Sequence, residues 1–180
     1  MKKYLAFLRG INVGGHKKIK MADLRILLEQ EGFSKVTTYI QSGNIVFTSK
    51  VEPTVVLENK IAGILKNAYK FDVPVVVRTA EQLQKVVEDN PFTNSKDLAE
   101  NKLYFALLQQ KPDSKNINVL SSIGFENDAL VITPTCVYLQ YSLGASKAKC
   151  TNNFIEQKLK VSATTRNYKT MQKMLALALV

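Results

Sequence analysis

The chain has 180 residues, of which 46% are hydrophobic and 22% are charged, proportions typical of a globular protein that can bury a core. It carries 25 Lys and Arg against 15 Asp and Glu, a net charge of +10. No apolar run approaches the roughly 20 residues needed to span a bilayer, and the opening MKKYLAFLRG lacks the long apolar stretch of a signal peptide. We therefore expect a cytoplasmic protein that does not enter a membrane.

The first 79 residues alternate between strand and helix patterns in the order β-α-β-β-α-β. Strands are expected at residues 3–9, 36–40, 44–49 and 72–79, with QSG turning the middle pair into a hairpin. Helices are expected at residues 21–31 and from Pro53 onward, where proline suits the first turn. This order predicts a split βαβ, or ferredoxin-like, unit.

The same pattern recurs after a linking helix that ends near Asn90-Pro91. Strands are expected at residues 102–109, 129–133, 136–142 and 161–165, and helices at 112–123, 151–160 and 166–179. Thr151 or Asn152 is expected to cap the second of these helices, and Thr165 the last. The sequence therefore predicts an α+β fold of two ferredoxin-like (α/β-plait) units, 1–79 and 102–180, joined by 80–101 and ending in a helix. The recurrence suggests an internal duplication.

The first strand is apolar on both faces, because Leu5 and Phe7 alternate with Tyr4 and Ala6. Both faces of the sheet are therefore expected to be buried, either because the units cover each other's open faces or because the extra helices do so. This burial disfavours an RNA-recognition module, which has the same topology but exposes aromatic residues on its third strand. Here the segment GNIVFT offers only Phe47.

Metal and cysteine chemistry find little support. Cys136 and Cys150 form no CxxC pair, and His16 is the only histidine. A disulfide framework, a cysteine-rich zinc site and a zinc site with two imidazoles are therefore excluded. Ser42 and Ser146 have no obvious base, so that no nucleophile is assigned. The sequence favours a non-catalytic protein with no metal and no cofactor.

Positive charge is concentrated at the two ends of the chain. Residues 1–79 carry 13 basic and 6 acidic side chains, residues 80–141 carry 5 and 8, and residues 142–180 carry 7 and 1. If the basic ends meet in the fold, they form one positive face, which favours phosphate-bearing partners. The alternative is a surface of scattered, solubilising lysines.

The segment RGINVGGHKKIK, residues 9–20, lies between the first strand and the first helix. Gly10, Gly14 and Gly15 can adopt positive φ, so that successive N–H groups can turn toward one point. Such a loop before a helix N-terminus can bind an anion. The segment matches neither GxxxxGK[ST] nor GxGxxG, and a turn without a ligand is the alternative.

Basic side chains in and beside this loop support the anion-binding interpretation. Lys17, Lys18 and Lys20 add positive charge, and Arg9 can supply a forked pair of donors. Replacing Lys17 and Lys18 by glutamate is therefore expected to weaken binding without changing the fold.

The chain contains several distinctive motifs, which are RGINVGG followed by KIKMADLRILLEQEGF, then TYIQSGNIVF, FDVPVVVRT, NPF and ATTRNYKT. They closely resemble those of a widespread bacterial family of unknown function. The family is typed by the RGINVGG loop and the YIQSGN hairpin, and the resemblance spans nearly the whole chain. It implies two ferredoxin-like units in one compact molecule and no established activity, substrate or cofactor. Relatives often have arginine where this chain has Ala145.

The candidate ligand-binding residues combine the glycine loop with polar positions that recur in this family. They are Arg9, Gly10, Asn12, Gly14, Gly15, Lys17, Gln41, Ser42, Gly43, Asn44, Ser146, Lys147, Arg166 and Asn167. Arg78 is a further recurring position. In the hairpin at 41–44, Ser-Gly and Gly-Asn are also ordinary turn dipeptides.

Three functions follow as hypotheses. The leading one is a non-catalytic module that binds nucleic acid or a nucleotide. The second is an enzyme acting on a small phosphorylated or carboxylated metabolite, with Arg9, Asn12, Gln41 and Asn44 in a pocket between the units. The third is a protein-interaction or homodimer module that uses the apolar LALALV at the C-terminus.

Overall fold

The computed structural model describes residues 1–50 and 52–179, with the backbone but not the side chain of Ser95. The chain divides into two compact units. One comprises Met1–Gln84 together with the end of the chain from Lys173 on, and the other comprises Lys85–Gln172. The expected boundaries near residues 79 and 102 stay a prediction.

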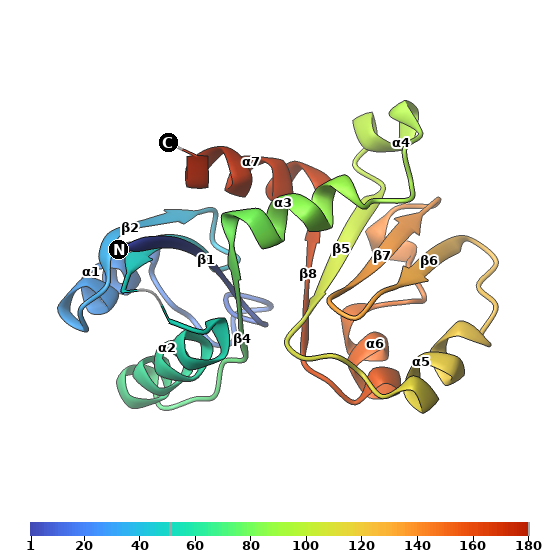
Figure 1. Ribbon diagram of the computed structural model, residues 1–180. Coiled ribbons are helices and arrows are strands. Elements are labelled where there is room, and N and C mark those ends of the chain that lie inside the picture. The colour runs from blue at the N-terminus through green and yellow to red at the C-terminus, as the bar shows by residue number, and fades with distance from the viewer. Residues whose placement is uncertain (51, 180) are drawn as a thin grey trace. The chain divides into compact units, whose positions relative to one another are not determined.

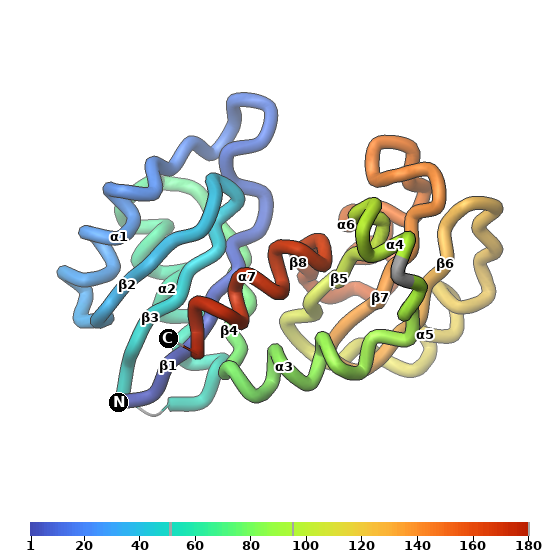
Figure 2. The backbone as a smooth tube through the Cα atoms, turned by 90° about the horizontal axis from the view of Figure 1, so that it is seen from above, coloured from blue at the N-terminus to red at the C-terminus, as the bar shows by residue number. Residues whose placement is uncertain are grey.

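The first unit is a four-stranded antiparallel sheet with two helices (Figure 1). Its elements are β1 (Lys2–Leu8), α1 (Met21–Gln30), β2 (Ser34–Tyr39), β3 (Asn44–Ser49), α2 (Thr54–Tyr69) and β4 (Val75–Thr79). The strands lie side by side in the order β2-β3-β1-β4, which can be followed in Figure 2. This is the predicted ferredoxin-like arrangement.

The rest of the chain repeats this arrangement. Its elements are α3 (Ala80–Glu88), α4 (Ser95–Ala99), β5 (Leu103–Leu108), α5 (Ser114–Ser121), β6 (Asp128–Ile132), β7 (Cys136–Tyr141), a 3-10 helix η1 (Ala145–Lys147), α6 (Asn152–Leu159), β8 (Ala163–Asn167) and α7 (Tyr168–Leu179). The second sheet has the order β6-β7-β5-β8 and is also antiparallel. The predicted α+β fold of two ferredoxin-like units with a C-terminal helix is confirmed. No helix among the described residues is both long and apolar enough to cross a membrane.

The two sheets also agree in register. Arg78 is the fourth residue of β4 and pairs with Leu5, while Arg166 is the fourth residue of β8 and pairs with Phe105. Each of these arginines is 8% exposed. Both units thus have a buried arginine at the same position of β4 and β8, and the suggested duplication stays a prediction.

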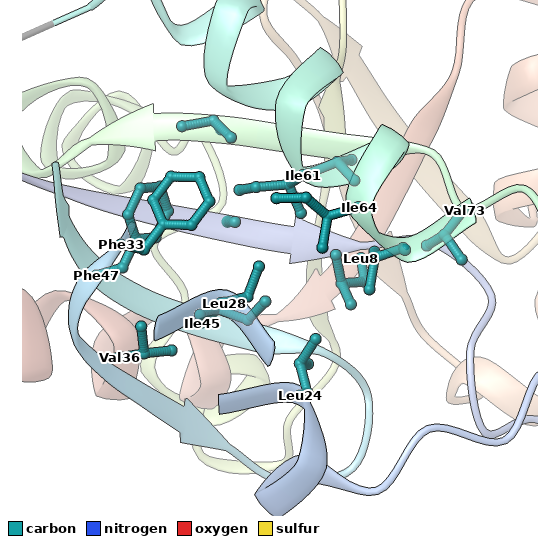
Figure 3. Packing of buried hydrophobic residues seen from close by; sticks show 14 of the residues in the cluster. Leu8, Leu24, Leu28, Phe33, Val36, Ile45, Phe47, Ile61, Ile64 and Val73 are labelled. Carbon is teal, nitrogen blue, oxygen red and sulfur yellow. The ribbon is translucent and has the colours of Figure 1, made fainter. Parts of the chain in front are cut away.

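Helical spacing of apolar residues places α1 and α2 on one face of the first sheet. Leu24 and Leu28 of α1 and Ile61 and Ile64 of α2 pack with strand residues such as Phe47 in one buried cluster (Figure 3). The opposite face of the sheet is buried as well, at the positions Leu5, Phe7, Val46 and Val76. The expectation that both faces are buried is therefore confirmed.

The prediction that Thr165 caps the last helix is wrong. Thr165 is not a cap but a residue of β8, where it pairs with Ala106 and its hydroxyl donates to Asn152 Oδ1 at 2.8 Å. Because this pairing prolongs the strand, the cap moves to Asn167, whose Oδ1 accepts the amide of Thr170 at 2.8 Å. The short helices α4 and η1 lie where no regular element is predicted, since helices of five and three residues are too short to show a period.

Candidate functional site

Residues 9–20 form a small hairpin between β1 and α1. The amide of His16 donates to the carbonyl of Val13 at 3.0 Å, which closes a turn around Gly14 and Gly15. These glycines have φ values of 56° and 79°. A two-residue hairpin turn with two positive φ values favours glycine, since it has no Cβ. Both glycines are therefore needed by the turn itself.

Asn12 fastens this hairpin to the rest of the first unit. Its Nδ2 donates to the carbonyls of Ile19 at 2.9 Å and Gln41 at 2.8 Å, and its Oδ1 accepts the amide of Ile19 at 2.9 Å. Its own amide donates to the carbonyl of Lys17 at 3.2 Å. Asn12 has a φ of 55°, a conformation that asparagine tolerates better than most residues. Both N–H groups of its side chain are thus used within the protein.

Gly43 lies where no side chain fits. The amide of Leu8 donates to its carbonyl at 2.8 Å, which brings the end of β1 against the turn. A Cβ on Gly43 would lie 2.6 Å from Leu8 Cβ and 2.9 Å from Ile11 Cδ1, and its φ is 78°. Close approach of the backbone therefore explains this glycine.

Asn44, the first residue of β3, is fully buried. Its Nδ2 donates to the carbonyl of Tyr39 and to Ser42 Oγ, both at 3.0 Å. The side chain of Gln41 is exposed. The glycine loop and the 41–44 turn therefore lie together at one end of the first sheet, and their two asparagines hold the backbone there.

Four basic residues of the loop are exposed, and one of them also contacts the protein. The exposed residues are His16, Lys17, Lys18 and Lys20. The ammonium of Lys17 donates to the carbonyl of Asp72 and lies 5.8 Å from the centre of the Phe71 ring. No acidic residue occurs in residues 9–22. The result is a locally positive surface on a loop with internal hydrogen bonds.

Arg9 and Gly10 connect β1 to this loop. Arg9 is half-buried, and its amide donates to the carbonyl of Pro74 at 2.9 Å. Gly10 has a φ of 68°, although a Cβ there would meet no atom within 4 Å. The conformation of the chain, and not the space around it, favours glycine at this position.

The other four candidates belong to the second unit. Ser146 and Lys147 are exposed in η1. The side chain of Arg166 is buried, and its Nη1 donates to Thr164 Oγ1 at 2.7 Å. Asn167 caps α7 as described above. Arg166 and Asn167 thus have roles in the structure that need no ligand.

The loop that precedes α6 already holds a carboxylate of the protein. Asp128 Oδ2 accepts the amides of Lys149 at 2.7 Å and Cys150 at 2.9 Å. Burial raises the pKa of the Cys150 thiol to about 12, which makes a thiolate nucleophile unavailable at neutral pH. Among the residues the structure describes, no group of three His, Cys, Asp or Glu side chains is placed to hold a metal ion.

A hollow of about 500 Å³ lies on the face of the first sheet opposite α1 and α2. It is lined by Met1, Lys3, Lys35, Thr37, Val46, Thr48 and Leu177. Lys3 pairs with Thr48 and Thr37 pairs with Val46, so β1, β3 and β2 together form its floor. None of its residues is among the candidate ligand-binding residues from the sequence, and Leu177 was expected only as part of the apolar LALALV segment. No local pattern in the sequence indicates that these residues form a site, because only the strand register brings the polar residues of β1, β2 and β3 together.

Comparisons with known proteins agree with this description. A family model described as "Protein of unknown function (DUF1697)" matches residues 1–138. The chain belongs to this family. A solved structure of the conserved bacterial protein SP0830 from Streptococcus pneumoniae is similar, with a TM-score of 0.74 and 26% sequence identity over 98% of each chain. A comparison with curated proteins finds no match. The resemblance to a family of unknown function is therefore supported.

Proposed function

We propose that this DUF1697 protein is a non-catalytic, cytoplasmic module that binds a phosphate-bearing partner, nucleic acid or nucleotide, through the 9–20 loop. The observation that carries the proposal is the loop itself. It is fixed by the hydrogen bonds of Asn12, it exposes basic side chains, and residues 9–22 contain no acidic residue.

A loop held in this way is suited to binding. Within the loop, Asn12 bonds to Ile19, and it also bonds to Gln41 of the 41–44 turn. Lys17 bonds to the carbonyl of Asp72. A fixed loop loses little conformational entropy when a partner arrives, and this lowers the cost of association. The exposed cations then attract the partner without a prior rearrangement of the backbone.

Charge favours a polyanion as the partner. Lys18 and Lys20 make no ion pair within the described chain. The first unit carries 14 basic and 7 acidic residues. Neutralising phosphates releases condensed counterions, which supplies affinity without any base-specific contact. We therefore expect binding that weakens steeply as the salt concentration rises.

A binding role also fits the polar side chains near the loop. The amides of Asn12 and Asn44 donate to backbone carbonyls and to Ser42 Oγ, so they hold the protein together where a catalytic pocket would need them to face a substrate. His16 lies in the exposed turn, and within the described residues its side chain makes no hydrogen bond or ion pair with an acid that could orient it for catalysis.

The test is a titration of the full chain against fluorescein-labelled single- and double-stranded oligonucleotides, followed by anisotropy at several salt concentrations. The test variant is K18E/K20E, which leaves the internal contacts of Lys17 in place. The control is K111E/K115E, which makes the same change of net charge at exposed positions of the second unit.

We expect K18E/K20E to lower the affinity at least about tenfold and to reduce the log–log salt slope by about 1.5, with a smaller effect in the control. Equal losses in the two variants would mean that net charge alone drives binding, and unchanged binding in K18E/K20E would remove the loop as the site.

A further inference from the structure

We propose that the hollow on the face of the first sheet opposite α1 and α2 is a separate binding site for a phosphomonoester attached to an apolar body, the chemistry of a nucleoside monophosphate. This proposal does not rest on the function of the 9–20 loop, because the two sites share no residue. It rests on the charge, the hydroxyl groups, the apolar surface and the size of the hollow.

Charge selects an anion. Lys3 and Lys35 line the hollow, and no acidic side chain does. Neither lysine forms an ion pair within the part of the chain that the structure describes. A phosphomonoester carries about −1.5 to −2 charges at pH 7, which matches two ammonium groups better than the single charge of a carboxylate.

The hydroxyl groups of the hollow favour an anion with more oxygen atoms than a carboxylate. Thr37 and Thr48 present one hydroxyl each, and within the described residues neither side chain has a hydrogen-bond partner. Two ammonium groups and two hydroxyls supply more donors than the two oxygens of a carboxylate can accept. The three terminal oxygens of a phosphomonoester fit this set.

A β-bulge places one of the two lysines. Ser34 pairs with Thr48 and Thr37 with Val46, so β2 has one more residue than β3 between these pairs. Lys35 lies in this interval with a φ of 53°, a left-handed conformation that lysine seldom adopts. Bulges re-aim side chains and often lie next to binding sites. The bulge thus brings Lys35 to the rim of the hollow.

The rest of the lining selects an apolar body beside the phosphate. Val46 forms part of the floor, and Met1 and Leu177 are the other apolar residues. A volume of about 500 Å³ lies in the range of small-molecule sites, roughly 300–1,000 Å³. Inorganic phosphate would occupy the polar part alone, whereas a nucleoside monophosphate would also cover the apolar part.

The test is isothermal titration calorimetry of the full chain with AMP, adenosine and inorganic phosphate at low ionic strength. The variants are K3Q/K35Q, which removes both charges, and T37W, which fills the hollow with a side chain that strands accept well. Their circular dichroism and thermal unfolding are compared with the wild type. K111Q/K115Q is the control, and K18E/K20E tests whether AMP binds at the 9–20 loop instead.

We expect AMP to bind with a Kd below about 1 mM and adenosine and phosphate to bind at least about tenfold more weakly. K3Q/K35Q and T37W should each lower the affinity for AMP at least about tenfold, and the control K111Q/K115Q should bind it like the wild type. No binding of AMP, or equal binding by the wild type and folded K3Q/K35Q, overturns the proposal. Loss of AMP binding in K18E/K20E alone would place the nucleotide at the 9–20 loop, which also overturns this proposal but supports the other one.

Discussion

The side-chain amide of Asn12 donates to the backbone carbonyl of Gln41 at 2.8 Å. The two residues are 29 positions apart in the sequence, and this bond joins the glycine-rich loop after β1 to the turn before β3. The motifs RGINVGG and YIQSGN therefore form one local structure. The two most distinctive segments of the chain are fixed to each other by an asparagine side chain.

Asn12→Ala should destabilise the protein. The substitution removes three hydrogen bonds and leaves the amide of Ile19 without its acceptor, so we expect a loss of about 2 to 4 kcal/mol in the free energy of unfolding. Urea unfolding followed by circular dichroism measures this. Asn59→Ala, on the exposed face of α2, is the control and should change the value by less than about 0.5 kcal/mol. Similar values for both variants would contradict the role given to Asn12.

Two glycine substitutions should distinguish the stability cost of close packing from the cost of a positive φ. Gly43→Ala places a Cβ 2.6 Å from Leu8 Cβ, whereas Gly15→Ala meets no atom within 4 Å, and both residues have φ near 80°. We expect Gly15→Ala to lower the free energy of unfolding by about 1 kcal/mol, because of the backbone conformation alone. Gly43→Ala should lower it by at least about 2 kcal/mol more, because the added Cβ overpacks the turn. Thermal and urea unfolding of the pair would test this, and equal losses would show that the turn has room to adjust.

In the first unit, the contribution of an ion pair to the free energy of unfolding should depend on the burial of its two side chains and not on the distance between them. Arg78 Nη1 lies 3.7 Å from Glu58 Oε1 with both side chains under 10% exposed, whereas Lys66 Nζ lies 2.9 Å from Asp72 Oδ1 with both well exposed. Glu58 also accepts the amide of Val77 at 2.8 Å.

Arg78→Ala leaves the Glu58 carboxylate buried without this partner and should cost about 3–5 kcal/mol. Lys66→Ala should cost less than about 1 kcal/mol. Urea unfolding of both variants is the measurement. A small effect of Arg78→Ala would show that water or another group compensates the carboxylate.

The protein should lose stability in alkaline solution. Burial raises the pKa of Cys150 from 9.0 to about 12 and raises that of Tyr141 above its ordinary value of 10.0. The unfolded chain releases both protons at the ordinary values while the folded protein retains them, so rising pH favours unfolding. Stability from these groups is complete below about pH 8 and declines as the pH rises from 9 toward 12.

Urea unfolding at about pH 7, 9 and 10.5 measures this decline. Cys150→Ala should flatten the profile between pH 9 and 10.5, because it removes one of the groups that titrate only in the unfolded chain. A profile of Cys150→Ala that parallels the wild type would show that the thiol does not contribute.

Local signals in the sequence predicted the order of the elements well. Strands and helices carried the expected periods, and Thr151 caps α6, where its Oγ1 accepts the amide of Phe154. Thr165 was misassigned because its pairing with Ala106 comes from a strand distant in sequence. The same limit applies to the sites. The partners of Asn12 and the residues of the hollow are brought together by strand register and by the bulge at Lys35, neither of which has a local signal.

The salt dependence of oligonucleotide binding tests the central claim most directly. Wild type and K18E/K20E are titrated in parallel with the same labelled single strand at several salt concentrations. We expect a wild-type slope of a few units and a slope smaller by about 1.5 in the variant, since each lysine contributes about 0.7 to 0.9. Two proteins with the same affinity and the same slope would contradict the claim that the 9–20 loop binds phosphates.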